Sequence, residues 1–456
     1  MLTRDDTVIR VSILLVLSLS TPVLAQSSRQ GTRWTASLSS QSVGADLPPL
    51  TLEAALTEAI AGNPDLVALR RTADVSIHRP TQEQGLPAPR LEGQIWQWPI
   101  DTLNPANTNM YMLTMSQDLP GRGKRALRTA LADKDVDIAQ NNVAIRSREV
   151  QNEVKQVYAE LGLTRKAIEI HESNSDLLRQ FADMSTAKYE TGHISLQDVL
   201  KSVVELSTLH EDLVALNERS ALAEARLNTL LNRPPEAPIG RLDEPRSIEL
   251  LVSSAELQEL AVGHEPALRA AALERERAEA ARAVAKREYK PDFFVAGGYM
   301  ILPHGRDAVT GTVGLTWPSS PWSRKKLDAA VAEADAEVEA AQARERALES
   351  RVRLDVQSAY VRLASAQRRA SLLEDTVIPQ SQQALEISRG AYQADRGDVL
   401  ALIDGRRTLL DAQMGYFEAV RDAAQAASDL ERVVGVDGIA SGARASLVPA
   451  IARRMP

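Results

Sequence analysis

The stretch that decides the fold runs from Lys124 to Thr191 and reads KRALRTALADKDVDIAQNNVAIRSREVQNEVKQVYAELGLTRKAIEIHESNSDLLRQFADMSTAKYET. It contains no proline and a single glycine, Gly162. At about 1.5 Å per residue, a helix of this length would span about 100 Å. Typical globular helices end after about 8–20 residues, so this run predicts a coiled coil or the wall of a tube.

An equally uninterrupted return follows the long helix. Gly192 marks a turn, and the run from His193 to Asn232 is again free of glycine and proline. Arg233-Pro234-Pro235 then ends the helical pattern. The sequence therefore predicts a hairpin of very long helices, which must pack on other helices to hide its apolar stripe.

The same plan occurs twice, about 202 positions apart. The matching pairs are Asn63-Pro64 with Glu265-Pro266, Pro89 with Pro291, Tyr158 with Tyr360, and Asn232-Arg233 with Val434-Gly435. This internal two-fold repeat predicts a first repeat (49–232), a connector (233–253), a second repeat (254–435) and an irregular tail (436–456). The N-terminal pattern predicts a signal peptide (1–25), and the polar, Ser-rich segment after it predicts a flexible leader (26–48). The second long helix should run from Ser323 to Ile378, where Pro379 kinks it or ends its first section.

Two pairs of short strands precede the long helices, one pair in each repeat. We expect them at about 90–98 with 108–119 and about 292–302 with 308–317, while Pro80 to Pro89 should break the preceding helix. Apolar and polar residues alternate in these segments, as in VTGTVGLTW from Val309 to Trp317. Their lengths suit tilted strands that cross a bilayer, which need about 9–11 residues.

Four strands are too few to close a barrel, because about eight is the minimum. An open sheet edge cannot face lipid either. Both problems are solved if three identical chains contribute 12 strands to one barrel. The expected fold is therefore mainly α, with long helical hairpins and a trimeric, 12-stranded transmembrane β-barrel. The tryptophans 96, 98, 317 and 322 could form an aromatic girdle, or pack in the core of a soluble sheet.

Composition and the N-terminus narrow the function. Arg4 and Arg10 precede a short apolar run, Val11 to Leu19, and Val23-Leu24-Ala25 offers a cleavage site, so we expect the mature chain to leave the cytoplasm. The net charge of −8 without a basic stripe argues against nucleic-acid binding. The chain has no cysteine, which excludes disulfides, thiolate metal sites and catalytic thiols. No catalytic constellation is present, so no enzyme activity and no cofactor are predicted.

The motifs resemble those of one family, the TolC-like outer-membrane efflux proteins of Gram-negative bacteria. The similar segments cover Leu50 to Gly435 and include LEAAL (52–56), NPDL (63–66), QDLPGRGKR (117–125), YETGHISL (189–196), the segment 392–404, LLDAQ (409–413) and LERVVG (430–435). QDLPGRGKR is most similar to the strand-to-helix junction of the heavy-metal cation efflux branch, the CzcC- and CusC-like channels.

The resemblance implies a homotrimer whose barrel lies in outer-membrane lipid and continues into a periplasmic tunnel of 12 helices. It also implies a periplasmic adapter and an inner-membrane pump, expected to be of the RND type. The adapter would meet the hairpin tips, at about 189–198 and 392–404. The expected contact residues are Thr191, Gly192, Ile194, Ser195 and Leu196 in the first tip, and Gly397, Val399 and Leu400 in the second, where Arg396 and Asp398 also lie.

Charged residues at the tips are candidates for a gate. They are Asp395, Arg396, Asp398 and Asp404 in the second tip and Asp198 in the first. In a three-fold assembly each aspartate becomes a ring of three carboxylates, which can select cations or hold a gate closed through salt bridges. The alternative is that these residues only cap helices and solvate turns, where aspartate is favoured.

Several methionines of the predicted strands are candidate metal ligands. Met110, Met112 and Met115 lie close together, with Met300 in the other strand pair, and soft thioethers can bind copper or silver. Because Met110 and Met115 point to opposite faces of one strand, the sequence favours ordinary packing, and no metal site is predicted. The six histidines are scattered without ligand spacing.

The leading functional interpretation is a passive exit duct of a tripartite efflux system. The expected cargo is metal cations first and small toxic organic compounds second. The alternative from another class is a soluble periplasmic coiled-coil adapter or scaffold, which would share the signal peptide and the hairpins but would not need four strands of bilayer length.

Overall fold

The computed structural model describes residues 48–97, 100, 104, 107–243, 252–303, 305–394 and 396–439. The predicted signal peptide, nearly all of the predicted leader, Trp98, His304, Asp395 and the tail beyond 439 lie outside the described residues.

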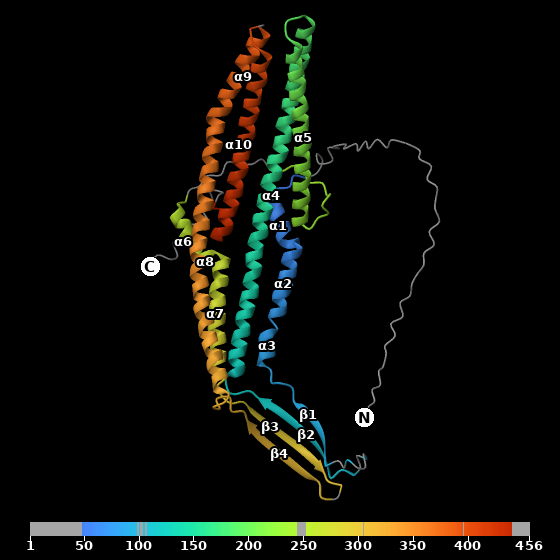
Figure 1. Cartoon of the computed structure of the whole chain (residues 1–456), viewed down its shortest axis with the longest axis vertical. Coiled ribbons are helices and arrows are strands. Elements are labelled where there is room, and N and C mark those ends of the chain that lie inside the picture. Colours follow the sequence, from blue (N-terminus) through green and yellow to red (C-terminus); the bar gives the residue numbers. More distant parts are fainter. Residues whose placement is uncertain are drawn as a thin grey trace, which may run out of the picture. The chain divides into compact units, whose positions relative to one another are not determined.

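Long helices dominate the described part of the chain (Figure 1). The helices are α1 (Leu52–Gly62), α2 (Pro64–Ser76), α3 (Arg79–Gln84), α4 (Lys124–Glu190), α5 (Leu196–Leu230), α6 (Ser254–His264), α7 (Pro266–Arg287), α8 (Arg324–Leu372), α9 (Ile378–Gln393) and α10 (Val399–Val434), and the strands are β1 (Arg90–Trp96), β2 (Met110–Leu119), β3 (Phe293–Ile301) and β4 (Ala308–Leu315). Of these described elements, no helix has a stretch both long enough and apolar enough to cross a membrane.

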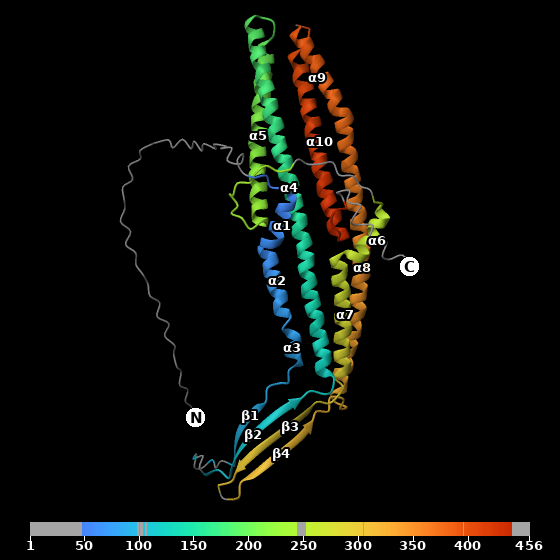
Figure 2. The same ribbon diagram turned by 180° about the vertical axis from the view of Figure 1, so that it is seen from behind.

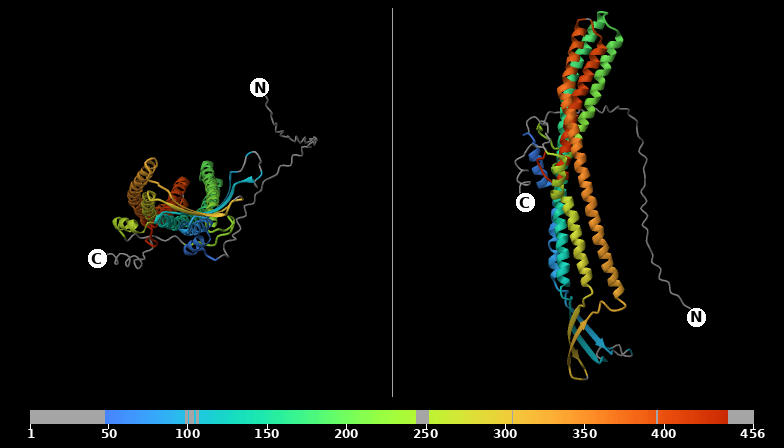
Figure 3. Two further views of the ribbon diagram at one scale, coloured as in Figure 1. Left: turned by 90° about the horizontal axis from the view of Figure 1, so that it is seen from below. Right: turned by 90° about the vertical axis from the view of Figure 1, so that its left-hand side faces the viewer.

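The helices form two hairpins that pack on each other. Helix α4 packs against α5, α7 and α10, and α8 packs against α7 and α10 (Figure 2). The sheet lies at one end of the helices, where α4 and α8 begin and α7 ends (Figure 3). The hairpin tips lie at the opposite end, where α4 and α9 end. This arrangement separates a sheet end from a tip end.

Two hydrophobic clusters occupy positions about 202 residues apart. One cluster joins α1, α2, α4 and α5, and the other joins α6, α7, α8 and α10. The paired buried residues are Ala55 and Leu257, Ala59 and Ala261, Leu66 and Leu268, Val150 and Val352, Val154 and Val356, and Leu161 and Leu363. A third cluster, which includes Leu178, Phe181, Tyr392 and Leu402, joins the two hairpins near their tips.

The prediction that Pro80 to Pro89 breaks the helix is wrong for the first half of this segment. A short helix, α3, begins at Arg79 and ends at Gln84. Pro80 lies in the first turn of this helix. Backbone N–H groups in a first turn make no intrahelical hydrogen bond, so proline loses nothing there, and its fixed φ is compatible with a helix. The remainder, up to Pro89, has no regular structure.

The second long helix is interrupted before Pro379 by a π turn. Helix α8 ends at Leu372, residues Leu373–Val377 form the π turn, and α9 begins at Ile378. Proline cannot donate to the carbonyl four residues earlier, and its ring crowds that carbonyl. The wider π turn accommodates both effects, so the chain continues as helix after Pro379 instead of ending.

The four strands form one antiparallel sheet in the order β1-β2-β3-β4. The central pair joins the two halves of the chain, since β2 pairs with β3 from Tyr111 opposite Ile301 to Leu119 opposite Phe293. Strand β1 is shorter than expected and ends at Trp96, after which Gln97 takes a positive φ of 55°. The hydroxyl of Thr108 donates to the carbonyl of Trp96 and closes this end of the strand pair.

Candidate functional site

The two hairpin tips enclose a cleft of about 480 Å³. Both hairpins contribute to its walls, which consist of Gly192, His193, Ile194, Ser195, Asp198, Arg396, Gly397, Asp398 and Val399. The structure therefore brings together most of the residues that the sequence predicted at the tips. Thr191 follows the last residue of α4, and its hydroxyl donates to Lys188 O at 3.0 Å.

The first tip is built by a glycine turn and a capping box. Gly192 has a φ of +77°, a conformation that residues with a Cβ rarely adopt. Ser195 caps α5: its Oγ accepts from the N–H of Asp198 at 3.3 Å and donates to Asp198 Oδ2 at 2.8 Å. Asp198 therefore belongs to a capping box, which occupies its Oδ2 atom.

The second tip is built by a close approach of the backbone. A Cβ added at Gly397 would lie 2.8 Å from the amide nitrogen of Tyr392, so only glycine fits without a shift. Asp398 caps α10, since its Oδ1 accepts from the N–H of Leu400 at 3.2 Å. Arg396 is exposed beside it, and Asp395 lies outside the described residues.

A second groove, of about 630 Å³, runs between α5 and α10 below the tip cleft. Its lining combines exposed apolar side chains with charged ones: Leu196, Gln197, Leu200, Lys201, Val204, Glu205, Leu400, Ile403, Asp404 and Arg407. Asp404, Leu196 and Leu400 lie in this groove and do not line the tip cleft. The predicted tip residues are therefore divided between two neighbouring surfaces.

A contact between the hairpins that the sequence did not reveal lies just behind the tips. Lys188 Nζ donates to the carbonyl of Tyr392 at 2.7 Å and lies 4.2 Å from the centre of the Tyr392 ring. The Tyr392 hydroxyl lies 3.3 Å from Ser185 Oγ. These contacts join α4 to α9, and no pattern in the sequence links residues so far apart.

Arg406 in α10 is a second feature that sequence reasoning missed. Its side chain is only 1% exposed, and its Nε and Nη2 atoms are buried without a hydrogen-bond acceptor. Burial lowers the pKa of this guanidinium, and the charge of Glu205 only partly opposes that effect. The helical spacing of Arg406 with Leu402 and Leu410, which are both buried, is the signal in the sequence that could have indicated a core position.

The sheet has one apolar and one polar face. The register places Leu91, Ile95, Tyr111, Leu113, Met115, Leu119, Phe293, Val295, Tyr299, Ile301, Val309, Val313 and Leu315 on one face. The opposite face is mixed and carries Arg90, Glu92, Gln94, Thr114, Ser116, Asp118, Thr310 and Thr312, together with Trp96, Met110, Met112, Phe294, Ala296, Met300 and Ala308. We call it the polar face, because all the charged side chains of the four strands lie on it. The apolar face is widely exposed, with Val309 at 81% and Val313 at 80%.

Of the described tryptophans considered for a girdle, Trp96 lies in the sheet, whereas Trp317 and Trp322 follow the end of β4. Trp317 and Trp322 are exposed just after β4, and their ring centres lie 6.3 Å apart in an edge-to-face contact. Trp96 pairs with Met110 on the polar face. Trp96 therefore shares a face with Arg90 and Gln94, because alternate residues of a strand point to the same side, and its place in an aromatic girdle stays a prediction.

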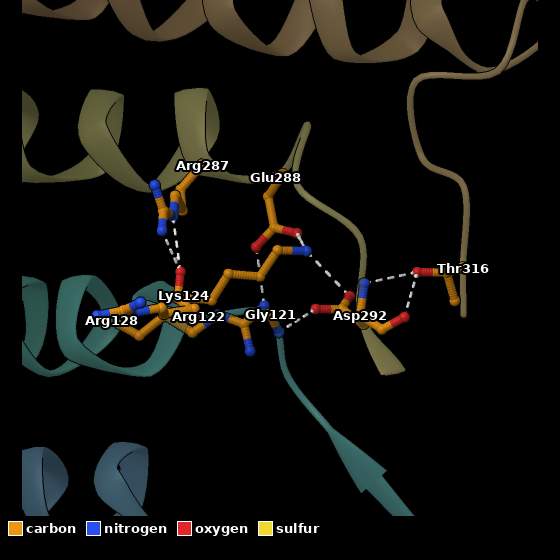
Figure 4. A network of polar contacts seen from close by, with 8 residues as sticks. All are labelled: Gly121, Arg122, Lys124, Arg128, Arg287, Glu288, Asp292 and Thr316. Atoms are coloured by element: carbon orange, nitrogen blue, oxygen red, sulfur yellow. Dashed lines mark hydrogen bonds and ion pairs between the residues drawn. The ribbon is translucent and has the colours of Figure 1, made fainter. Parts of the chain in front are cut away.

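A buried ion cluster joins the sheet to the helices (Figure 4). Lys124 Nζ, with a side chain only 1% exposed, lies 2.8 Å from Glu288 Oε2 and 2.9 Å from Asp292 Oδ2. The N–H of Gly121 donates to Asp292 Oδ1 at 2.7 Å, and Arg128 pairs with Glu288. Burial disfavours the ionised carboxylate, yet hydrogen bonds from Lys124 and Arg128 hold the pKa of Glu288 below its usual range.

A buried carboxylate lies at the N-terminus of α7. Glu265 Oε1 accepts from the N–H of Ala267 at 3.3 Å, while Oε2 is buried without a partner. Burial raises the pKa of Glu265 to about 7, although the cap hydrogen bond and the charges of Arg432 and Arg148 oppose the shift. The matching residue of the first half is Asn63, a neutral amide that donates to Leu230 O at 3.2 Å.

Among the residues that the structure describes, no group of three or more His, Cys, Asp or Glu side chains could hold a metal ion.

The family comparison matches both halves of the chain. The model of the family described as "Outer membrane efflux protein" matches residues 55–233 and 257–436. A curated relative, the cobalt-zinc-cadmium resistance protein CzcC of Cupriavidus metallidurans, is 24% identical over 393 residues, which cover 85% of this chain and 90% of that protein.

Solved structures share the fold. The outer-membrane channel OprN matches with a TM-score of 0.72 at 17% identity, over 85% of this chain and 90% of that one. A structure of CusC matches with a TM-score of 0.71 at 16% identity, over 84% of this chain and 92% of that one. Because the family model covers most of the sequence, the chain belongs to the outer membrane efflux protein family and is an outer-membrane efflux channel.

Proposed function

We propose that three copies of this chain form one duct, in which 12 strands close a barrel in the outer membrane and 12 long helices form a tunnel in the periplasm. The duct does no chemistry of its own and lets cargo pass outward. Channels of this family work with an adapter and an inner-membrane pump, and the pump, which we expect to be of the RND type, supplies the energy.

One observation carries the proposal: a predominantly apolar face and a more polar face run across all four strands. An apolar face that is exposed over four strands needs lipid, while the polar face needs water. In the described sheet, β1 and β4 each pair on one side only. Lipid cannot satisfy open edges, so pairing of β4 with β1 of the next copy is the simplest closure.

The two halves of the chain, 49–232 and 254–435, would arise from one duplicated unit. The paired buried residues of the two hydrophobic clusters and the double family match support this proposal. The connector (233–253), the tail (436–456) and a signal peptide that ends at residue 25 complete the proposed organisation.

The tip cleft would be the gate and the docking place of the adapter. Opening requires the α9–α10 hairpin to move away from α4, and the Lys188–Tyr392 contact lies across that path. Asp198, Asp398 and Asp395 would add carboxylates around the opening, and Asp404 would add a ring in the groove below. Thr191, Gly192, Ile194, Ser195, Leu196, Gly397, Val399 and Leu400 would offer the adapter backbone and apolar contacts.

We propose divalent metal cations as the cargo, since the relative CzcC is named as a cobalt-zinc-cadmium resistance protein. Small organic compounds are the second possibility. The soluble adapter or scaffold considered from the sequence is set aside by the family match.

The experiment that tests the duct measures the detergent-solubilised mature protein in two ways. Light scattering should give three chains per particle, and planar bilayers should show single channels. A monodisperse, folded monomer that stays soluble without detergent would contradict the proposal.

The gate assignment has its own test. Asp398→Ala and Asp395→Ala should each raise single-channel conductance if these carboxylates help to close the tips. Asp411→Ala is a matched control, because it removes an exposed carboxylate from the same helix outside both grooves. Unchanged conductance and cation preference in both tip variants would show that Asp398 and Asp395 are only turn and cap residues.

A further inference from the structure

We infer that the junction between the sheet and the long helices carries a binding surface for the headgroups of anionic phospholipids. The surface consists of a group of exposed basic side chains beside an exposed pair of tryptophans. The inference rests on the proposed function, because only a barrel in the outer membrane brings lipid to this level of the chain.

Three junctions between strands and helices lie side by side at this end of the sheet (Figure 4). The N–H of Gly121, after β2, donates to Asp292 Oδ1 at 2.7 Å. The N–H of Asp292, before β3, donates at 2.9 Å to the hydroxyl of Thr316, which follows β4. Six exposed basic residues lie at these junctions, and we call them the basic collar: Arg122, Arg125, Lys290, Arg324, Lys325 and Lys326.

Most of the basic collar has no carboxylate partner. Arg324 lies 4.0 Å from Asp328, whereas the other five residues form no ion pair within the described part of the chain. Arg125 donates to the carbonyl of Gln84 at 2.8 Å, which leaves its charge uncompensated. Contacts within one chain therefore do not explain why positive charge is concentrated here.

The charge of the collar differs from that of the opposite end of the sheet. The junction segments 118–126, 286–292 and 316–328 hold nine basic and four acidic residues, a net charge of +5 in a chain whose net charge is −8. The loops at the other end of the sheet, 97–109 and 302–307, hold one basic and two acidic residues. Only the end of the sheet next to the helices is suited to bind anions.

Helix stability does not explain the basic residues of α8 either. Arg324, Lys325 and Lys326 are the first three residues of this helix, and its first turn has no acidic residue. The N-terminus of a helix carries a partial positive charge, so cations in the first turn are unfavourable to the helix itself. A bound anion would compensate both the side chains and the helix end.

The tryptophan pair places the collar at the boundary of the apolar face. Val313 and Leu315 of β4 are exposed on that face, and Trp317 continues their alternation. Trp322 is 83% exposed, and its ring centre lies 6.3 Å from that of Trp317. Indole rings prefer the level of the headgroups in a bilayer. Arg324 follows two residues after Trp322, so the collar begins where the apolar face ends.

The combination of charge and apolar surface selects the ligand. Lysine and arginine bind phosphate through charge-assisted hydrogen bonds. The apolar face beside the collar would contact the acyl chains of the same molecule. A nucleic acid or an acidic peptide would neutralise the collar but leave the indole rings and the apolar face in contact with water. An anionic phospholipid in the leaflet that borders the helices satisfies both parts of the surface.

The test measures lipid selectivity through tryptophan fluorescence of the full channel, purified from membranes and reconstituted in phosphatidylcholine vesicles. Trp34→Phe, Trp96→Phe and Trp98→Phe leave Trp317 and Trp322 as the only emitters. Dibrominated phosphatidylglycerol or dibrominated phosphatidylcholine then replaces part of the lipid, and the ratio of their quenching constants gives the preference for the anionic headgroup. We expect phosphatidylglycerol to be preferred, and the preference to fall as salt screens the charges.

The variants remove charge from the collar and from a matched position. Lys325→Gln combined with Lys326→Gln should lower the preference at least about fivefold, since one basic residue near an anionic membrane surface contributes about this factor. Arg351→Gln is the control, because it removes an exposed charge from α8 about 25 residues, or about 38 Å, further along the helix. It should leave the preference unchanged. Helical circular dichroism shows that each variant keeps the fold.

The inference is overturned by no preference in the parent protein, by an unchanged preference in the double variant, or by an equal loss in Arg351→Gln. Loss of the preference when inorganic phosphate replaces chloride at constant ionic strength would also overturn it, because the collar would then bind a free anion. If the protein conducts in planar bilayers but shows no preference, the lipid surface alone fails. If neither brominated lipid quenches the tryptophans, the chain does not insert, and the proposed duct fails together with the inference.

Discussion

Replacing Arg406 by methionine should stabilise the protein, although the substitution removes a charge and its hydrogen-bonding groups. The guanidinium is 1% exposed, and its Nε and Nη2 have no acceptor. Each unsatisfied buried donor costs about 1–3 kcal/mol, and a charged group costs more. The negative charge of Glu205 offsets part of this cost by electrostatic attraction to the guanidinium. Methionine fills a similar volume without either cost.

The expected gain follows from these opposing contributions. Replacement of buried charged groups by well-packed apolar residues of similar volume stabilises proteins by about 1–4 kcal/mol. Arg406 lies between buried Leu402 and Leu410 on α10, so the new side chain would join an existing apolar stripe. We therefore expect the free energy of unfolding to rise by about 1–4 kcal/mol in Arg406→Met.

The assay is urea unfolding of the purified protein, followed by helical circular dichroism. Arg407→Met is the matched control, because Arg407 is exposed in the neighbouring groove, where substitutions usually change stability by less than about 0.5 kcal/mol. If the buried charge also favours separation of the hairpins, Arg406→Met should lower single-channel conductance. A fall in stability of Arg406→Met below both wild type and Arg407→Met would refute the reasoning.

Three further predictions concern other parts of the fold. Between about pH 4.5 and 7 folded Glu265 keeps a proton that the unfolded chain has released, so the free energy of unfolding should fall across this window as pH rises. Glu265→Gln should remove that slope and stabilise the protein at pH 8 by about 2–3 kcal/mol in urea titrations, and an unchanged slope would exclude Glu265 as its source. Lys124→Met should leave Glu288 and Asp292 facing each other without their buried cation, so unfolding in urea should become easier by about 3–5 kcal/mol; a loss below about 1 kcal/mol would mean that Arg128 compensates. Gly397→Ala should push the backbone of Tyr392 away and raise the rate of proteolysis at the tips, whereas unchanged cleavage would show that the tip already tolerates a Cβ.

The long helices and the turns between them are local properties that the sequence alone determined. Long runs without proline, and with no glycine other than Gly162, predict α4 and α5 because little interrupts the backbone hydrogen bonds. Gly192 predicts the turn because glycine readily adopts a positive φ, here +77°. Alternation in Val309–Trp317 predicts a two-faced strand for the same local reason. Local patterns failed where a proline is tolerated in a first turn, as at Pro80 in α3.

Only the tertiary structure decided which distant residues meet. The pairing of β2 with β3 places Met112 beside Met300, and the packing of the hairpins places Lys188 beside Tyr392. The predicted tip residues are divided between two surfaces, since Asp404 lies in a groove apart from Asp398. Burial of Arg406 is a similar case. A sequence determines the helical face on which a side chain lies, whereas its partner depends on how separate elements come together in space.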